Sequence, residues 1–560
     1  MIAQRIFSFI NKETGGLHKA AYVLAFFTLI YQVLGIVRDR LLAYTFGAGD
    51  VLDIYYAAFR IPDLILIFAG SIVSLAVIVP LLTNKIEEGD AAAKSFVDSI
   101  FSFFLVSIIV ICTLLFIFAP IILKIIFPGL AVGASFDNLI LLTRIFLLSP
   151  IFLGISNLFS GIVQVYKRFF VYALSPIFYN VGIIIGITLF YPSFGIKGLA
   201  FGVVLGALLH MLVQIPSVYE KGLFPTLRIS IDWGIIKRVA LSSIPRSFTI
   251  SITSIVILFL LGFASTLDKG TIAIFNLAFN LQSVPLSIVG VSYSLAAFPM
   301  LASLFIRDEM KQFINKVEIS AKHIVFWSLP ILTLFIVLRA QIVRTVLGSG
   351  EFSWSATRLT AATLAIFIIS VFAQSLILLY LRSYYATGDT KKPLIFGVIS
   401  GSITILLAFF FLAFPASNAY LKYFLEALLK VGGVSGTTIL FLPLAFSIGT
   451  FLNLILLHRS FSKDFGRFSG DFWKTSRQSF YTAIIVGFTT FQSLRIFDDF
   501  FNIQTVFGIF AQGLFSGLMG IIIGVCLLIL LGNKEVYDVI DVIRRKFRKP
   551  DIILPEQVEL

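Results

Sequence analysis

Charged residues are scarce in this chain of 560 residues. Only 13% of its residues are Asp, Glu, Lys or Arg, whereas 58% are hydrophobic, and the mean hydropathy is +1.00. A soluble domain is about one quarter charged, so this composition excludes an ordinary soluble protein and is typical of a polytopic membrane protein.

Cysteine and the motifs of common active sites are also lacking. The two cysteines, Cys112 and Cys526, lie inside apolar runs and indicate neither a disulfide framework nor a metal cluster. We find no H-E-x-x-H zinc motif, no nucleophile elbow and no Walker loop. We therefore expect no enzymatic activity, no cofactor or metal, no ATP hydrolysis and no cleavable signal peptide.

Long apolar runs, broken by turn residues and charges, predict about fourteen transmembrane helices, each needing about 20 apolar residues. We expect these spans near residues 20–46, 51–83, 96–127, 138–165, 170–190, 197–218, 238–264, 270–305, 317–346, 357–386, 392–414, 432–457, 478–495 and 505–531.

Basic residues are distributed unevenly between the connections. A net charge of +14 is compatible with nucleic-acid binding, but most of the 43 Lys and Arg fall in the two tails and in alternate connections. That bias is typical of cytoplasmic loops. We therefore expect both termini in the cytoplasm, an even number of spans and no nucleic-acid partner. Both tails also have the spacing of amphipathic basic helices that lie on the lipids of the inner leaflet.

An internal repeat relates the second and eighth predicted spans. Residues 53–82 resemble residues 273–302: Ala58-Phe59 matches Ala278-Phe279, and Gly70 matches Gly290 at the same offset. An offset of six spans predicts two similarly oriented six-helix halves with a cavity between them at mid-membrane, where transported solutes bind. The predicted segments are a cytoplasmic amphipathic segment (1–19), an N-lobe (20–218), a cytoplasmic linker (219–237), a C-lobe (238–457), two helices outside the repeat (458–531) and a cytoplasmic basic tail (532–560).

Several charges fall inside the first two spans. A charge at mid-bilayer costs about 2.5–3.5 kcal/mol on insertion scales, so it normally faces a cavity or a partner. One interpretation is that Arg38, Asp39 and Arg40 pair locally near the end of the span. The other is that Arg38 and Arg60 flank a water-filled cleft and bind an anion, because guanidinium stays protonated and binds phosphate through two N–H groups. Asp53 is either a helix N-cap or a counter-ion of the arginines.

Other polar residues of the spans have less specific interpretations. Arg246, after Pro245 at the start of the seventh span, either lines the cavity or extends to the interface. His210 is expected to form a hydrogen bond inside the bundle rather than to bind a metal. Amide side chains of the spans, including Asn180 and Asn276, are expected to connect helices first and to line a cavity second.

The stretch VLGIVRDRLLAYTFGAGDVLDIYYAAFRIPDL (33–64) and the later motifs GIVQVYKRFFVYALSPIFYN, GSGEFS and YYATGDTKKP resemble the MurJ/MviN lipid II flippases of the MOP exporter superfamily. The resemblance covers the first twelve predicted spans in patches. It implies an all-α membrane protein with fourteen helices, two pseudo-symmetric lobes around a V-shaped cavity, and a groove for a lipid tail formed by the last two helices. It also implies transport of lipid II, an undecaprenyl-diphosphate-linked peptidoglycan precursor, across a bacterial inner membrane by alternating access.

The residues of the family are only partly present. Arg38 and Asp53 match motif positions, and Arg60 replaces another basic residue, whereas an earlier arginine of the family falls at Gln32 and one in the eighth helix falls at Asn280. Either Arg38, Arg60 and Arg246 take over binding of the diphosphate, or the cargo carries less charge. The residues expected to bind substrate are Arg38, Arg60, Arg246, Asn280 and Gln32, with Asp39 and Asp53 as structural residues or counter-ions.

Two other functions stay open. One is export of another polyprenyl-linked glycan or of a small solute by a member of the same superfamily, and the other is a non-transporting membrane scaffold. An antiporter would need a cation-binding carboxylate, and acidic residues are scarce in the later spans. The expected partners are the undecaprenyl-linked lipid and membrane lipids, and we expect a monomer because the cavity lies within one chain.

Overall fold

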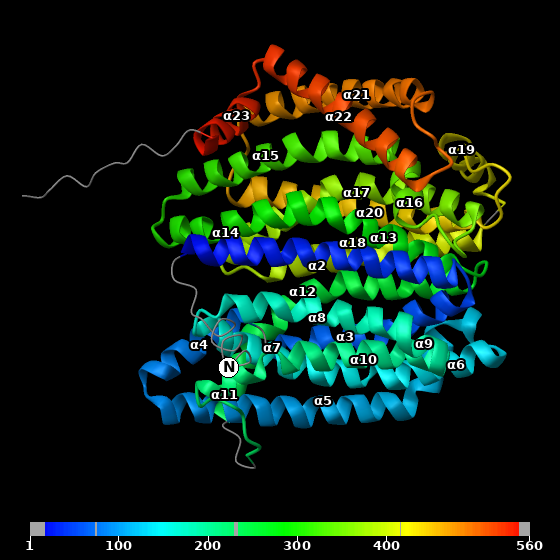
Figure 1. Cartoon of the computed structure of the whole chain (residues 1–560). Coiled ribbons are helices and arrows are strands. Elements are labelled where there is room, and N and C mark those ends of the chain that lie inside the picture. The colour runs from blue at the N-terminus through cyan, green and yellow to red at the C-terminus, as the bar shows by residue number, and fades with distance from the viewer. Residues whose placement is uncertain (1–16, 73–74, 229–232, 415, 548–560) are drawn as a thin grey trace, which may run out of the picture. The chain divides into compact units, whose positions relative to one another are not determined.

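The computed structural model describes residues 17–72, 75–228, 233–414 and 416–547, apart from some side chains within the helices. Every regular element in these residues is a helix (Figure 1). Eleven helices of the described residues are long and apolar enough to cross a membrane. Helices also occupy the predicted first, second and seventh spans, so the prediction of an all-α polytopic membrane protein is confirmed.

The helices before the predicted linker correspond to the first six spans. They are α2 (Leu17–Phe46), α3 (Asp50–Ile72), α4 (Leu75–Glu87), α5 (Asp90–Ile126), η1 (Pro128–Leu130), α6 (Gly133–Phe146), α7 (Leu148–Val165), α8 (Phe169–Ile185), the π-helix η2 (Gly186–Phe190), α9 (Tyr191–Phe194), α10 (Ile196–Leu212) and α11 (Ile215–Glu220).

The later helices correspond to the remaining eight spans. They are α12 (Trp233–Ser265), α13 (Thr271–Leu286), the π-helix η3 (Ser287–Val291), α14 (Ser292–Ile306), α15 (Met310–Val337), α16 (Arg339–Val346), α17 (Trp354–Ala386), α18 (Lys391–Ala413), α19 (Ala419–Leu429), η4 (Thr437–Leu440), α20 (Phe441–Asp464), α21 (Gly470–Asp498), α22 (Val506–Leu530) and α23 (Lys534–Phe547).

One connection contains a helix that the prediction of spans did not include. The predicted span 51–83 corresponds to α3 and α4, and residues 73 and 74 between them lie outside the described residues. The connection after residue 414 contains the helix α19, which the span pattern did not predict. Its Tyr420 and Tyr423 are 90% and 77% exposed, as suits a short helix at a membrane surface, where aromatic side chains accumulate.

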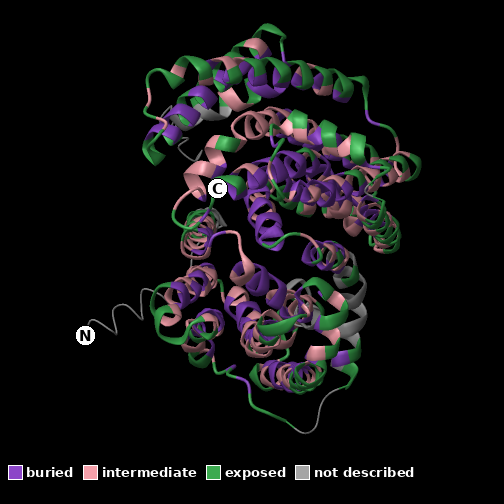
Figure 2. Ribbon diagram, turned by 90° about the vertical axis from the view of Figure 1, so that its right-hand side faces the viewer, coloured by how far each residue is buried: buried purple, intermediate pink, exposed green. Residues whose placement is uncertain are grey.

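The chain forms two compact units. Unit 1 contains residues 1–281, 346–367 and 389–453, and unit 2 contains residues 282–345, 368–388 and 454–560. Figure 2 shows that many helices combine a buried side with an exposed side. Exposed positions include large apolar residues such as Ile121, Phe409 and Phe507, which is typical of a surface that faces lipid. The predicted lobe boundaries follow from the repeat and not from these units, and they stay a prediction.

Glycines bring α8 and α10 of unit 1 into close contact. A Cβ built on Gly202 would lie 2.8 Å from the backbone N of Gly186 and 3.0 Å from the carbonyl O of Gly182. These distances are too short for any real side chain. Small residues spaced by four are a common device for helix association in membranes, because they allow the backbones themselves to meet.

Polar side chains connect α7 to α10 beside this contact. Ser156 Oγ lies 2.7 Å from His210 Nδ1 and accepts a 2.6 Å hydrogen bond from Gln214 Nε2, and Ser160 Oγ donates to Gln214 Oε1 at 3.0 Å. The prediction that His210 forms a hydrogen bond within the helix bundle is therefore confirmed.

The second copy of the repeat contains a π-helix. This π-helix, η3, contains Gly290 and separates α13 from α14. Helices broken near mid-length are frequent in transporters built from repeats. In the first copy Gly70 lies near residues 73 and 74, which are outside the described residues.

The first part of the predicted linker is fixed to α5 by one carboxylate. Asp98 is fully buried and accepts from Lys94 Nζ at 2.6 Å and from Thr226 N and Oγ1 at 2.8 and 2.9 Å. Arg228 Nε lies 3.1 Å from the same side chain. The segment around Thr226 is therefore held by charge-assisted hydrogen bonds rather than loosely connected.

Replacing Asp98 with alanine is expected to release this segment. Several donors would lose their acceptor at once, so we expect trypsin to cleave after Arg228 faster by on the order of tenfold or more. Limited proteolysis of the purified protein, followed by mass spectrometry of the fragments, measures this rate. Asp90→Ala, at the exposed first residue of the same helix, is the matched control. Equal cleavage rates in the two variants would contradict the anchoring role.

In unit 2 the helix α23 packs against α15 and α22. Val536, only 3% exposed, lies in a cluster with Phe326 and Leu528, and Val539 and Ile540 border it. The predicted amphipathic helix of the C-terminal tail is present, but this part of its apolar face contacts protein and not the inner leaflet. The predicted helix of the N-terminal tail lies in residues 1–16, outside the described residues.

Candidate functional site

Arg38 lies in a polar cluster of unit 1 that connects α2 to α8. Its Nε and Nη2 donate to Asp39 Oδ1 at 2.9 and 2.7 Å, and its Nη1 donates to Asn180 Oδ1 at 3.1 Å. The side chains of Arg38 and Asp39 are 22% and 11% exposed. The arginine therefore pairs locally, as one interpretation predicted, and it also reaches a distant helix through a neutral amide.

The second oxygen of the Asp39 carboxylate binds α13. Asn280 Nδ2 donates to Asp39 Oδ2 at 3.0 Å, so this carboxylate accepts from a guanidinium on one oxygen and from an amide on the other. Asn280 occupies the place where the resemblance expects an arginine. In this chain a neutral donor fills that place, which lowers the positive charge of the cluster but keeps the connection between α2 and α13.

Arg60 on α3 binds α13 one turn away from that contact. Its Nη2 donates to Asn276 Oδ1, and Asn276 Nδ2 donates to the carbonyl O of Ile272 at 2.8 Å. Asp63 follows Arg60 by one helical turn and attracts it electrostatically. Among the described residues the Arg60 guanidinium has only a neutral amide as hydrogen-bond acceptor, which leaves much of its donor capacity for another group.

Three buried polar atoms of the cluster have no hydrogen-bond partner in the described part of the protein. They are Tyr56 Oη, Arg60 Nε and Asn180 Nδ2. Tyr56 lies within electrostatic range of both Arg38 and Arg60. Buried polar groups are nearly always paired, so a group of unpaired ones needs an explanation such as a ligand. All three can donate, and a phosphate has only acceptor oxygens.

Asp53 has partners that differ from both interpretations of the sequence. Its carboxylate is 4% exposed and accepts from the backbone N–H groups of Gly270 and Ala273 at 2.6 and 2.8 Å. It therefore caps the N-terminus of α13, where the helix dipole favours a negative charge. The described contacts include no bond from Asp53 to an arginine, and its role in the site as a structural residue or counter-ion stays a prediction.

The two remaining residues predicted to bind substrate are Gln32 and Arg246. Gln32 lies on α2, half-buried, two turns before Arg38. Arg246 lies on α12, in a part whose side chains are outside the described residues. The binding roles of Gln32 and Arg246 stay predictions.

Sequence reasoning missed some members of the cluster. Asn180 and Asn276 were expected to connect helices, which they do, but nothing in the sequence pointed to their contact with the arginines. Tyr56 and Asp63 were not singled out at all. A polar residue one helical turn from Arg60 on either side is the signal that would have found them, since residues three or four apart share a helix face.

Residues 42–511 match the family described as lipid II flippase MurJ. The chain belongs to this family. The chain is 25% identical over 385 residues to the lipid II flippase MurJ of Burkholderia cenocepacia, covering 67% of this chain and 75% of that protein. It is 28% identical over 398 residues to the probable lipid II flippase MurJ of Rhizobium tropici, covering 69% and 74%. Membership of a flippase family confirms the prediction of a multi-pass membrane transporter rather than an enzyme.

Solved structures share the fold. A lipid II flippase MurJ in an inward closed conformation superposes with a TM-score of 0.71 at 21% identity, over 93% of this chain and all of that one. An inward-facing multidrug resistance MATE family transporter of the MOP superfamily superposes with a TM-score of 0.60 at 14% identity, over 77% and 95%. The fold expected from the resemblance to the MOP exporter superfamily is therefore confirmed.

Proposed function

We propose that this chain moves lipid II from the inner to the outer leaflet of a bacterial cell membrane, and that Arg38 and Arg60 bind its diphosphate. The observation that carries the proposal is the set of unpaired buried donors, Tyr56 Oη, Arg60 Nε and Asn180 Nδ2, beside these two arginines. A diphosphate supplies several acceptor oxygens and negative charge, and it matches both the unpaired donors and the guanidinium groups.

The charges of the cluster support an anionic cargo. Asp39 partly neutralises Arg38 through a 2.7 Å ion pair, whereas Arg60 has a neutral amide and a carboxylate one turn away. In the cluster around Arg38 and Arg60, hydrogen-bond donors still outnumber acceptors. Loss of the arginines of the family at Gln32 and Asn280 lowers the charge available for the cargo, and hydrogen bonds from neutral groups such as Tyr56 and Asn180 are the compensation that we propose.

Contacts between the predicted lobes suit alternating access. Asp39 with Asn280, Arg60 with Asn276 and Asp53 with the start of α13 all join residues 20–218 to residues 238–457. These three contacts are hydrogen bonds, and packing of α12 against α3, with Phe68 against Phe248, joins the same two ranges as well. We propose that these bonds break when the cavity opens toward the outer side, and that the cytoplasmic position of both termini follows the positive-inside bias.

The proposal predicts that the chain replaces a depleted lipid II flippase. In a bacterium depleted of its own flippase, expression of this chain should restore surface-accessible lipid II, measured by its degradation by an externally added lipid II-cleaving toxin. Arg38→Ala should lower that signal at least about tenfold, because it removes a charged donor from the binding site. Membrane levels of both proteins are compared by immunoblotting.

Lys124→Ala is the matched control, since it also removes one positive charge but from an exposed site on α5. It should rescue as well as the unchanged chain. Failure of the normally inserted chain to rescue would refute lipid II as cargo and favour another polyprenyl-linked glycan, a small solute or a scaffold. Full rescue by Arg38→Ala would refute the assigned site but not the activity.

A further inference from the structure

A basic pocket in unit 2 lies where two membrane-crossing helices end. Its volume is about 460 Å³, and its lining includes His458, Arg459 and Lys463 from the last turns of α20 and Arg467, Phe468 and Trp473 from the connection to α21 and its first turn. Both helices are candidate spans. Their adjoining ends therefore lie at the depth of the lipid headgroups, outside the cluster around Arg38.

Hydrogen bonds and ring contacts hold the residues that line the pocket in place. His458 Nδ1 lies 2.7 Å from the Oη of Tyr380, which is 1% exposed, so the other ring nitrogen is left for the pocket. The buried Phe468 ring lies 5.8 Å from the His458 ring and 4.9 Å from the Phe472 ring. The connection itself is tied to α15, because Ser469 N donates to Glu318 Oε2 at 2.8 Å. A site built in this way needs little ordering when a ligand binds.

The positive charges of the pocket have no counter-charge among the described residues. Arg459, Lys463 and Arg467 take part in none of the ion pairs or side-chain hydrogen bonds of these residues. The carboxylates of this region have other partners: Asp464 accepts from Tyr384 Oη at 2.9 Å, Glu318 accepts from Ser469 N at 2.8 Å, and Asp471 lies 3.7 Å from Lys534 Nζ. Three unpaired cations around one hollow need an anion to balance them.

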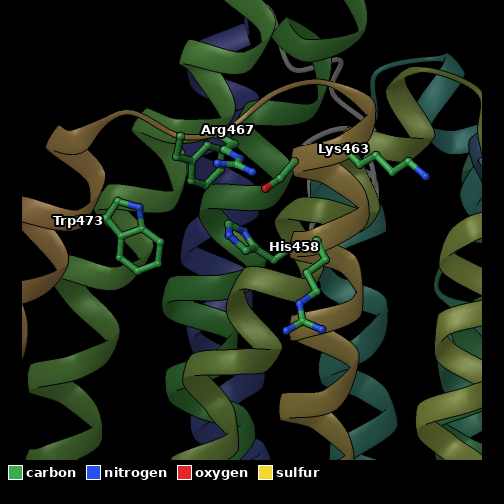
Figure 3. Close-up of a pocket in the computed structure, with 7 residues that line it drawn as sticks. His458, Lys463, Arg467 and Trp473 are labelled. Carbon is green, nitrogen blue, oxygen red and sulfur yellow. The ribbon is translucent and has the colours of Figure 1, made fainter.

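The arrangement of the side chains indicates where the anion binds. Figure 3 shows the His458 ring and the Trp473 indole facing the same hollow, with Arg467 near His458, whereas the Lys463 ammonium group points away from them. Trp473 is 55% exposed, as suits an aromatic ring at the membrane interface. Arg467 therefore adjoins His458 in the pocket, Lys463 contributes charge from the rim, and Arg459 belongs to the lining as well.

We propose that this pocket binds the phosphate of an anionic phospholipid headgroup, with Arg459 and Arg467 as its ligands, His458 as a further hydrogen-bond partner and Trp473 beside the glycerol or the first acyl carbons. Basic pockets between membrane helices on the cytoplasmic side commonly bind anionic headgroups. A bilayer presents such lipid at high local concentration at this depth, which favours it over a soluble phosphate. The site is separate from the proposed lipid II site and does not depend on that function.

Retention of lipid by the purified full-length protein tests the proposal. Delipidated protein in an uncharged detergent is titrated with phosphatidylglycerol or phosphatidylcholine, and the bound lipid is counted by native mass spectrometry. We expect a preference for phosphatidylglycerol of about tenfold or more, since each basic residue near an anionic headgroup contributes about 1 kcal/mol. Arg459→Gln with Arg467→Gln should remove most of that preference.

The chain offers a control with the same change of charge. Lys474 and Arg477 are exposed on the same helix α21 but do not line the pocket, so Lys474→Gln with Arg477→Gln should keep the preference. An equal loss in both double variants would overturn the proposal in favour of general attraction by a basic loop. An unchanged preference in the pocket variant would overturn it as well. Thermal unfolding in the same detergent verifies that both variants are folded.

Two further measurements identify the location and source of the anion. Trp473 becomes the single tryptophan when the other three, Trp233, Trp327 and Trp354, are replaced with phenylalanine. The quenching of its fluorescence by brominated phosphatidylglycerol is then compared with the quenching by brominated phosphatidylcholine. Stronger quenching by the anionic lipid supports the proposal, and equal quenching overturns it. Displacement of the lipid by millimolar glycerol 1-phosphate, or stronger binding of a polyprenyl diphosphate, would also overturn it, because the pocket would then take a soluble anion or the cargo.

Discussion

Replacing Gly202 with leucine is expected to abolish folding or leave a strongly destabilised protein. A Cβ at this position would lie within 3.0 Å of backbone atoms of both Gly182 and Gly186, and backbone cannot move aside as a flexible side chain does. The helices α8 and α10 would have to separate along their contact. Overpacking of a tight core costs about 1–3 kcal/mol and occasionally more, and a whole leucine against backbone belongs at or above the upper end.

The loss should extend to transport. Asn180 precedes Gly182 by two residues on α8 and accepts from Arg38 Nη1, so a displacement of α8 moves an acceptor of the proposed binding site. Gly202→Ala should have a smaller effect of the same kind. Thermal unfolding in detergent and the yield of monodisperse protein in gel filtration measure both variants.

Gly35→Ala is the control for this prediction. Gly35 lies in α2, and a Cβ there would meet no atom within 4 Å. Its replacement should leave stability unchanged or raise it slightly, because alanine is favoured over glycine within helices by up to about 1 kcal/mol. A Gly202→Leu protein as stable as Gly35→Ala would show that α8 and α10 do not meet at these glycines.

The membrane-crossing helices could be predicted from the sequence because hydropathy alone determines them. A backbone in lipid must satisfy its own hydrogen bonds, so a run of about 20 apolar residues has few structures other than a helix. The π-helix η3 and the helix α19 escaped prediction, since both depend on local backbone geometry within or between apolar runs.

The candidate site could be predicted only in part. Arg38 and Arg60 stand out because charge inside an apolar run is costly, and this cost is visible without any structure. Their acceptors Asn180 and Asn276 lie 142 and 216 residues away, and an asparagine in a membrane helix has many alternative roles. In the sequence the basic pocket around Arg467 was visible only as a connection rich in Lys and Arg, because the charge of a connection does not reveal which of its side chains line a pocket.

The contact of Asp53 with the start of α13 could not be predicted from the sequence for a different reason. It binds Ala273 N at a separation of 220 residues, which equals the offset between Ala58 and Ala278 in the repeat. The repeat therefore pairs this aspartate with the position that it contacts. The donors, however, are backbone N–H groups of glycine and alanine, and such donors leave no signature in the residue types.

Asp53→Asn is expected to abolish rescue of a depleted flippase and to lower the stability of the protein by about 2–4 kcal/mol. The carboxylate is buried and accepts two short hydrogen bonds from Gly270 N and Ala273 N at the start of α13. An asparagine of the same shape has only one acceptor oxygen, and its NH₂ group would face the second backbone N–H, so one buried donor would stay unpaired. The favourable interaction of the negative charge with the helix dipole would also be lost. Thermal unfolding in detergent and the surface-accessible lipid II assay measure the two effects.

Asp50→Asn is the matched control, because it removes the same charge from the first turn of the same helix α3. Among the described residues Asp50 accepts a side-chain hydrogen bond only from Ser135 Oγ, at 2.6 Å, so its replacement should cost about 1 kcal/mol or less. If the two variants were equally stable and equally active, the cap of α13 by Asp53 would contribute nothing to stability or transport.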